Sequence, residues 1–170
     1  QRSITPVFLF ANGAAGDIGP KHLHSEGIKR MSRNFYRSFT KNLWRSKPAS
    51  SAWNYESISF KLNKPSVDTQ KCLDTERLAN SYENMLDFII PLPTFFLPRE
   101  VTISKLNFAG KIFLLWPGEP TISVGRALTK LNTKKEILIL SMANNYLGYF
   151  TTMQEYNAGG YEACASFYNY

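Results

Sequence analysis

One stretch of the sequence, residues 111–162, restricts the folds available to this chain more than any other. It contains two apolar runs typical of buried strands, at 112–116 and 137–142, and an amphipathic segment between them, at 121–131. A strand, a helix and a second strand in this order indicate a βαβ unit. The sequence therefore predicts an α/β fold with a mixed sheet and flanking helices. The candidate buried positions of the central helix are Ile122, Leu128 and Leu131, and Thr121 is positioned to cap its start.

Polar and aromatic side chains that a core does not require follow both predicted strands. Pro117-Gly118-Glu119 follows the first strand, and residues 144–162 follow the second. Ligands bind beyond the carboxyl ends of the strands in such units, so we expect the active-site loops there. The side chains expected at this edge are one carboxylate and four phenols: Glu119, Tyr146, Tyr149, Tyr156 and Tyr161.

These residues have two interpretations. A carboxylate in the first turn of a helix is stabilised by the helix dipole, and tyrosines commonly pack half-buried. A tyrosine cluster beside a carboxylate can instead hold a metal or donate a proton to a polarised carbonyl group. The chemistry of the residue types leaves both interpretations open.

A glycine-rich loop follows a predicted short buried strand at residues 4–11. Gly13, Gly16 and Gly19 allow a tight turn and a close approach of the backbone to a neighbour. The loop is interpreted as a plain turn, as the lining of an active site or as a phosphate-binding loop. The Gly-Lys-Ser/Thr ending of a P-loop is missing, which disfavours the last interpretation.

Residues 25–45 carry the clearest helical pattern. Apolar residues recur every three or four positions on one side: Ile28, Met31, Phe35, Phe39 and Leu43. Basic residues occupy the opposite side: Arg30, Arg33, Arg37, Lys41 and Arg45. The pattern predicts a core-packed helix with a solvated basic face. An alternative is that this face approaches an anionic membrane surface, which the net charge of +7 also favours. Nucleic acid is not expected as a partner, because the aromatic residues lie on the other side.

The remaining segments complete the expected order. A strand is predicted at 55–62, a loop at 65–71, a helix beginning at Asp74 or Thr75, and an irregular proline-rich crossing at 91–98. Strands at 101–106 and 111–116 are predicted to form a hairpin. The two cysteines, Cys72 and Cys164, either form a disulfide in an oxidising compartment or remain free thiols. A chain of 170 residues corresponds to one domain or a large piece of one.

The segment PGEPTISVGRALTK, followed by ANNYLGYFTTMQEYNAGGYEACASFY, resembles the neutral/alkaline ceramidase family. That family carries Pro-Gly-Glu-(Phe)-Thr before a Gly-Arg helix, and later an Asn-x-Tyr-x-x-Tyr motif that leads to Tyr-Glu. The residues that match are Pro117, Gly118, Glu119, Thr121, Gly125, Arg126, Asn144, Tyr146, Tyr149, Thr151, Thr152, Glu155, Tyr156, Tyr161 and Glu162. The segment FANGAAGDIGP also resembles the family's Gly-Asp-x-Ser-Pro loop. The resemblance to the family extends from residue 8 to residue 168 and is strong near both ends of this range.

The resemblance implies a zinc amidase that releases the fatty acid from a lipid amide such as ceramide. The family's zinc is held by two histidines, a glutamate and a tyrosine; Glu119 matches the glutamate and Tyr149 the tyrosine. Tyr161 matches a tyrosine that contacts the amide, and Asp17 belongs to the substrate-binding loop. Zinc accepts such oxygen ligands and lowers the pKa of its water.

Three departures from the family pattern modify this expectation. The family's histidine ligands lie upstream of the Gly-Asp loop, and His22 and His24 match neither of them. The family's serine at the scissile amide is Gly19 here. Gly159-Gly160 stands where the family has a Gln-x pair, as in ceramidase-like bacterial proteins.

Residues 1–170 are therefore expected to be the C-terminal part of a ceramidase-like catalytic domain. An upstream segment or a partner chain would supply the two histidines and complete the site. A lipid amide is the expected substrate, and the family implies a secreted or periplasmic location, with membrane association. The alternative is a non-catalytic protein with the same fold that binds or scaffolds at a membrane surface.

Overall fold

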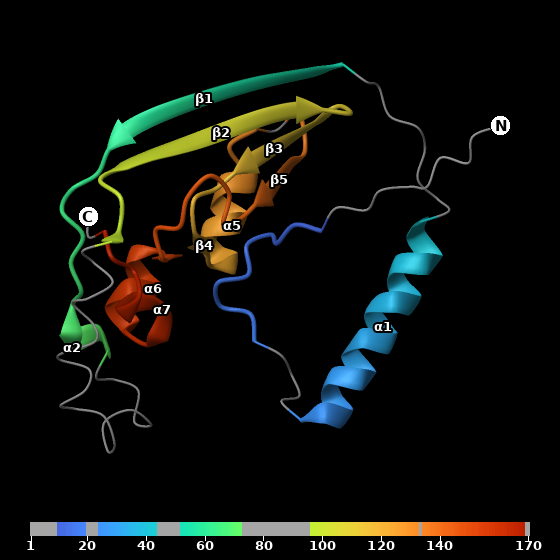
Figure 1. Cartoon of the computed structure of the whole chain (residues 1–170), viewed down its shortest axis with the longest axis horizontal. Helices are drawn as coiled ribbons and strands as arrows, with labels where there is room; N and C mark the ends of the chain where they lie inside the picture. The colour runs from blue at the N-terminus through green and yellow to red at the C-terminus, as the bar shows by residue number, and fades with distance from the viewer. Residues whose placement is uncertain (1–9, 20–23, 44–51, 73–95, 133, 169–170) are drawn as a thin grey trace.

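The computed structural model describes residues 10–19, 24–43, 52–72, 96–132 and 134–168. Figure 1 shows its helices and strands in chain order. They are α1 (Ser25–Leu43), β1 (Trp53–Lys61), α2 (Thr69–Cys72), β2 (Glu100–Phe108), β3 (Lys111–Leu115), β4 (Glu119–Pro120), α5 (Ile122–Thr129), β5 (Ile137–Leu140), β6 (Tyr149–Phe150), α6 (Met153–Ala158) and α7 (Tyr161–Cys164).

The main sheet contains the predicted βαβ unit. Its strand order is β1-β2-β3-β5, in which β1 and β3 are antiparallel to β2, while β5 is parallel to β3. Because α5 lies between β3 and β5 in the chain, the prediction of an α/β fold with a mixed sheet is confirmed. The predicted hairpin of β2 and β3 is also present. Its two turn residues, Ala109 and Gly110, both have positive φ, which matches the twist of the strands they join.

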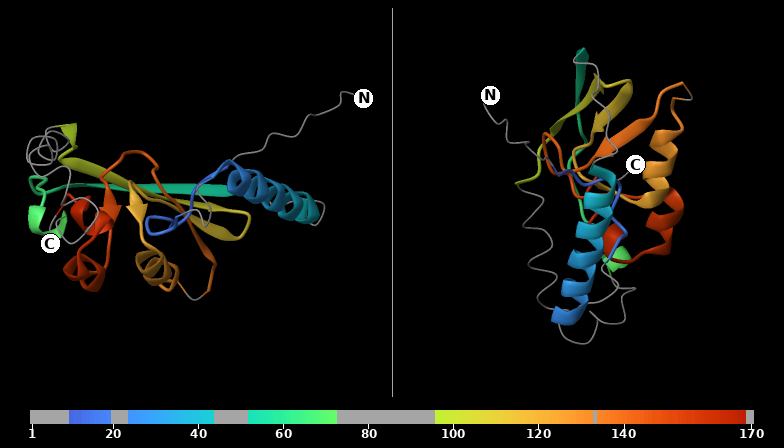
Figure 2. Two further views of the ribbon diagram at one scale, coloured as in Figure 1. Left: turned by 90° about the horizontal axis from the view of Figure 1, so that it is seen from below. Right: turned by 90° about the vertical axis from the view of Figure 1, so that its right-hand side faces the viewer.

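The helices near the carboxyl end of the chain lie on one side of this sheet, and α5 packs against its strand β5. Figure 2 shows α5, α6 and α7 on the same side of it. The buried side chains of Ile112, Ile137 and Ile139 share that face, since Ile112 pairs with Ile137 and Ile139 with Leu114. Gly125 of α5 lies against them: an added Cβ would lie 3.6 Å from Cδ1 of Ile139 and 2.3 Å from Cβ of Ala14. The absence of a side chain at Gly125 therefore lets Ala14 of the glycine-rich loop pack closely on α5, whereas Ile139 of the sheet lies at an ordinary van der Waals distance.

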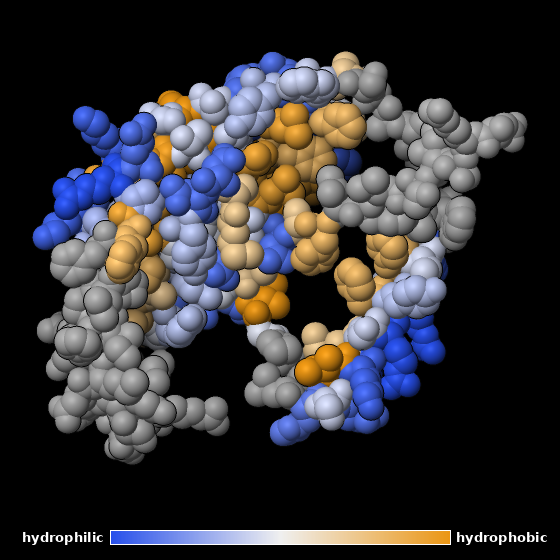
Figure 3. Space-filling model, viewed as in Figure 1, coloured by the Kyte–Doolittle hydropathy of each residue, from blue (hydrophilic) through white to orange (hydrophobic). Residues whose placement is uncertain are grey.

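The structure corrects the expected environment of α1. The helix forms from Ser25 to Leu43, but its apolar residues are exposed; Ile28 is 61% and Phe35 60% exposed. Phe35 stacks on Phe39 at 6.2 Å between ring centroids and meets Phe10 edge-on at 6.3 Å. Figure 3 shows hydrophobic residues facing a hollow between α1 and the rest of the molecule, with hydrophilic residues on the outer side of the helix. The prediction of a core-packed helix is wrong for the described residues, because Ile28, Met31, Phe35 and Phe39 stay exposed even though Phe10 contacts Phe35.

Smaller corrections concern the ends of elements. Leu131, expected to be buried, is 75% exposed because α5 ends at Thr129. The predicted loop at 65–71 turns helical at α2, and the predicted strand 55–62 corresponds to β1. Phe10 and Ala11, at the end of the strand expected at 4–11, lie in an irregular segment. Residues 4–9, the helix expected after Asp74, residues 91–95 and Arg45 lie outside the described residues.

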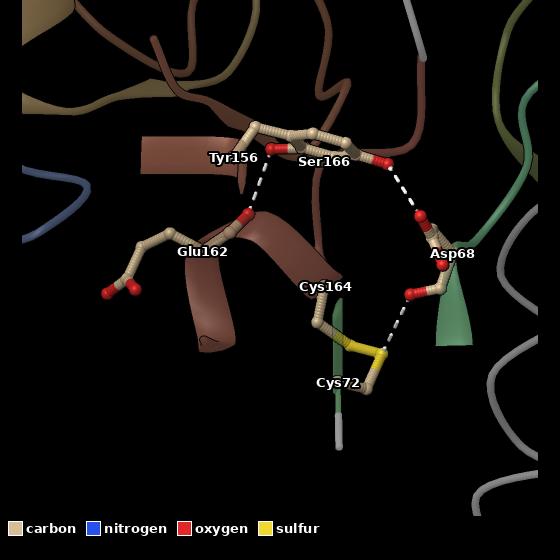
Figure 4. Close-up of a disulfide and its surroundings, with 6 residues drawn as sticks. All are labelled: Asp68, Cys72, Tyr156, Glu162, Cys164 and Ser166. Carbon is tan, nitrogen blue, oxygen red and sulfur yellow. Dashed lines mark hydrogen bonds between the residues drawn. A yellow bond between two sulfur atoms is a disulfide. The ribbon is translucent and has the colours of Figure 1, made fainter. Parts of the chain in front are cut away.

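Cys72 and Cys164 form a disulfide that joins α2 to α7 across 92 positions of the sequence. Figure 4 shows the bridge beside the hydrogen bond that the Tyr156 hydroxyl donates to Asp68. The structure thus decides between the paired and free cysteines that the sequence left open. Within the described ranges, no helix combines the length and apolar character that a membrane crossing requires.

Candidate functional site

Two short parallel strands bring the predicted site residues together. In the sheet formed by β4 and β6, Glu119 is the register partner of Tyr149. The backbone N–H of Glu119 donates to the carbonyl of Gly148 at 2.9 Å, and that of Thr121 donates to Phe150 at 2.9 Å. Gly118 permits this pairing, because an added Cβ would lie 2.5 Å from the carbonyl oxygen of Gly148. The two segments expected to form the carboxyl-end edge therefore meet there.

Glu119 and three of the tyrosines form one cluster. The Tyr146 hydroxyl donates to Oε1 of Glu119 at 2.8 Å. The rings of Tyr149 and Tyr161 meet edge to face, with centroids 5.4 Å apart. Tyr161 begins α7 directly after Gly159 and Gly160, both with positive φ, which turn the chain toward the cluster. Tyr156, expected at the same edge, instead contacts Asp68 beside the disulfide.

The cluster disfavours negative charge on two of its phenols, those of Tyr146 and Tyr149. Burial raises the pKa of Tyr146, and the hydrogen bond and charge of Glu119 raise it further. Burial likewise raises the pKa of Tyr149, with contributions from the charges of Glu119 and Tyr161 and from hydrogen bonding to both. Without a bound cation, both phenols are therefore protonated at neutral pH. A cation at this point would reverse the balance by favouring the ionised oxygen.

Two threonines hold the helices that flank the cluster. Thr121, the predicted cap of α5, accepts from the backbone N–H of Val124 and donates to Oε2 of Glu155 at 2.8 Å. Glu155 also completes a capping box with Thr152 at the start of α6. Burial opposes ionisation of Glu155, but hydrogen bonds from the Thr152 backbone and neighbouring hydroxyls outweigh it and lower its pKa. The first turns of α5 and α6 are thereby joined through one carboxylate.

The glycine-rich loop lies against β4. The Gly16 N–H donates to the Pro120 carbonyl at 3.0 Å, and an added Cβ at Gly16 would lie 2.8 Å from the carbonyl oxygen of Glu119. Oδ1 of Asp17 accepts from the backbone N–H of Ile122 at 2.7 Å, in the first turn of α5. Gly19 is exposed, with no atom within 4 Å of an added Cβ. The loop thus borders the cluster, and Asp17 fixes its distance from α5.

The described basic positions and His24 lie apart from this cluster, while His22 falls outside the described residues. Arg30, Arg33, Arg37 and Lys41 are exposed on α1, and Arg45 is outside the described residues. His24 is exposed just before α1. In the part of the chain that the structure describes, no group of three or more His, Cys, Asp or Glu side chains could hold a metal ion. The donors that the cluster offers are one carboxylate and neighbouring phenols, both oxygen ligands that zinc accepts.

An apolar cavity that no sequence pattern predicted adjoins Tyr149. Its volume is about 290 Å³. Its walls come from four separate parts of the chain: residues 60–63; Leu147 and residues 149–151; Tyr156; and Ser166 with Tyr168. No local sequence pattern predicts such a cavity, because each segment contributes only a few of the side chains that line it.

Comparisons with known proteins agree with the fold. No family model and no curated protein sequence matches the chain. Its structure is similar to that of neutral ceramidase from Pseudomonas aeruginosa, with a TM-score of 0.60, 15% identity, and coverage of 94% of this chain and 34% of that chain. It is also similar to a structure described as ceramidase complexed with C2, with a TM-score of 0.56, 13% identity, and coverage of 88% and 33%. The chain thus has a ceramidase-like fold and spans about a third of the length of these ceramidases.

Proposed function

We propose that this chain is part of a zinc-dependent, ceramidase-like hydrolase that cleaves the amide bond of a lipid such as an N-acylsphingosine. The observation that carries the proposal is the register pairing of Glu119 with Tyr149, with Tyr161 in contact with Tyr149. These residues match the carboxylate, phenol ligand and amide-binding tyrosine of the resembling family. The similarity of the fold to neutral ceramidase supports the same class of reaction.

Each residue has a defined role in this proposal. Glu119 and Tyr149 hold the zinc together with two histidines from an upstream segment or a partner chain. When bound, zinc supplies Lewis-acid polarisation of the carbonyl and a water molecule of lowered pKa. Tyr161 donates its hydroxyl proton in a hydrogen bond to the carbonyl oxygen, for which its exposed ring is accessible.

The glycine-rich loop is the part of the proposed substrate site in which this chain differs from the family. Asp17 holds the loop against α5, and Gly19 offers no hydroxyl where the family's serine binds the amide. We therefore propose that the substrate is N-acylsphingosine held without this hydrogen bond, or a related lipid amide, bound partly through that exposed loop. The disulfide supports a secreted or periplasmic location, since such bonds persist in oxidising compartments.

The second candidate is a non-catalytic binding or scaffolding protein with the same fold. Gly19 favours it, as does the exposed basic face of α1, which suits an anionic membrane surface. Zinc content separates the two candidates. A protein that carries the histidines but binds no zinc would support the scaffold.

The test is metal analysis of the full-length protein beside its Glu119→Ala and Tyr149→Phe variants. We expect one zinc per chain in the parent, and a weakened or lost site in both variants. Tyr156→Phe is the matched control, because it removes a phenol hydroxyl that contacts a different carboxylate, Asp68. A parent without zinc, or variants that retain the metal as tightly as the parent, would overturn the proposed zinc site.

A further inference from the structure

The segment 142–148 is joined to the segment 116–119 at both of its ends. Backbone N–H groups donate from Met142 to Gly118 at 3.0 Å, from Ala143 to Trp116 at 2.9 Å and from Leu147 to Pro117 at 2.8 Å. A fourth hydrogen bond runs in the opposite direction, from the Glu119 N–H to the carbonyl of Gly148. Tyr146 lies between these bonded positions, so its backbone is fixed relative to that of Glu119.

A side-chain contact also holds this segment to the main sheet. Asn144 has φ of 68°, a conformation that asparagine tolerates better than most residues. Its Nδ2 donates to Oγ of Ser104 at 3.0 Å, and the Tyr55 hydroxyl donates to the same oxygen at 2.7 Å. Ser104 is only 1% exposed in β2. The turn that presents Tyr146 is therefore anchored in the sheet as well as along residues 116–119.

This fixed turn places the Tyr146 hydroxyl 2.8 Å from Oε1 of Glu119. A phenol has a single proton to donate, and a carboxylate has two oxygens that accept. The contact thus restrains the rotation of the carboxylate while it occupies only one of its several acceptor positions. Tyr149 is related to Glu119 as its register partner on the adjacent strand and also hydrogen-bonds to it.

We propose that Tyr146 is a positioning residue, whose hydroxyl holds one oxygen of Glu119 so that the other is presented to the cation. This inference rests on the proposed zinc function. The two tyrosines of the Asn-x-Tyr-x-x-Tyr motif then have different roles: Tyr149 binds the metal, and Tyr146 orients the carboxylate that binds it. Partners of this kind orient metal ligands and raise metal affinity by about 10- to 100-fold.

The test compares metal affinity in the full-length protein and its tyrosine variants, titrated with zinc. Tyr146→Phe is expected to weaken zinc binding about 10- to 100-fold. Tyr156→Phe, which removes a phenol-to-carboxylate contact elsewhere, is expected to bind as the parent does. Unfolding midpoints of the metal-free proteins show whether each variant has folded.

Loading with Cu(II) gives a second readout. A metal-bound phenolate produces a charge-transfer absorption band, whereas a phenol that only donates to a carboxylate does not. The band is expected to persist in Tyr146→Phe and to vanish in Tyr149→Phe. If the band were lost in Tyr146→Phe but kept in Tyr149→Phe, the assignment of the two roles would be overturned, because Tyr146 would then be the ligand.

The Glu119→Asp background shows whether Tyr146 acts through Glu119. The shorter carboxylate withdraws from the Tyr146 hydroxyl, so adding Tyr146→Phe should change zinc affinity less than twofold. An undiminished loss in that background, or parental affinity in Tyr146→Phe itself, would overturn the positioning role and leave the zinc site intact. A parent that binds no metal would instead overturn the proposed function together with this inference.

Discussion

The two ends of the described chain contain equally regular sequence patterns with different outcomes. The compact region, comprising α2 and residues 96–132 and 134–168, buries apolar residues between a sheet and helices. The open region, comprising α1 and β1, forms its helix and strand but leaves them uncovered. Every residue of β1 is exposed, as is the apolar stripe of α1. Periodicity therefore specifies an element in both regions, whereas burial depends on a second surface.

The largest expected effect concerns the disulfide that closes the compact region. Replacing both Cys72 and Cys164 by serine is expected to lower the free energy of unfolding by about 4 kcal/mol, since the bond restricts a long loop in the unfolded chain. Urea unfolding of the parent and variant measures the difference. An unchanged midpoint would show that hydrogen bonds such as Gly160 N–H to Lys71 hold α2 to α7 without the bridge.

The next prediction compares one residue type in the two regions. Ile139→Ala is expected to destabilise the protein by about 3 kcal/mol, because the side chain is 8% exposed and its removal leaves a cavity. Ile58→Ala is expected to change stability by less than about 0.5 kcal/mol, because Ile58 is 65% exposed. The same unfolding measurement serves both variants. A large loss for Ile58→Ala in the full-length protein would identify a surface that covers β1.

The smallest expected effect compares two threonine hydroxyls. Thr152→Ala is expected to cost about 1 kcal/mol, because it removes the cap of α6 and half of the capping box. Thr40→Ala removes a hydroxyl that bonds back to backbone carbonyls of its own helix, those of Tyr36 at 2.9 Å and Arg37 at 3.2 Å. Alanine favours a helix interior, so its effect on stability should be near zero or slightly favourable. Equal losses at the two positions would contradict the distinction between the regions.

The candidate site was predictable where adjacent residues carry its chemistry. Glu119 after one strand, and Tyr149 and Tyr161 after the next, were expected at a common edge, and they lie together there. The contact between Tyr146 and Glu119 was not predictable, because it depends on how residues 142–148 bond to residues 116–119. The separation of Tyr156 from the cluster depends on α6, whose orientation is set by Thr152 and Glu155.

The sequence by itself determined the βαβ order, the hairpin, the capping threonine of α5 and the helical span of α1. These depend on side-chain periodicity, turn residues and local hydrogen bonds, all of which act over a few positions of the chain. Only the tertiary structure decided that the cysteines pair, that the stripe of α1 lies open, and that Tyr146 bonds to Glu119. Each of these depends on the distance between segments remote in sequence, which packing and hydrogen bonding across the whole fold determine.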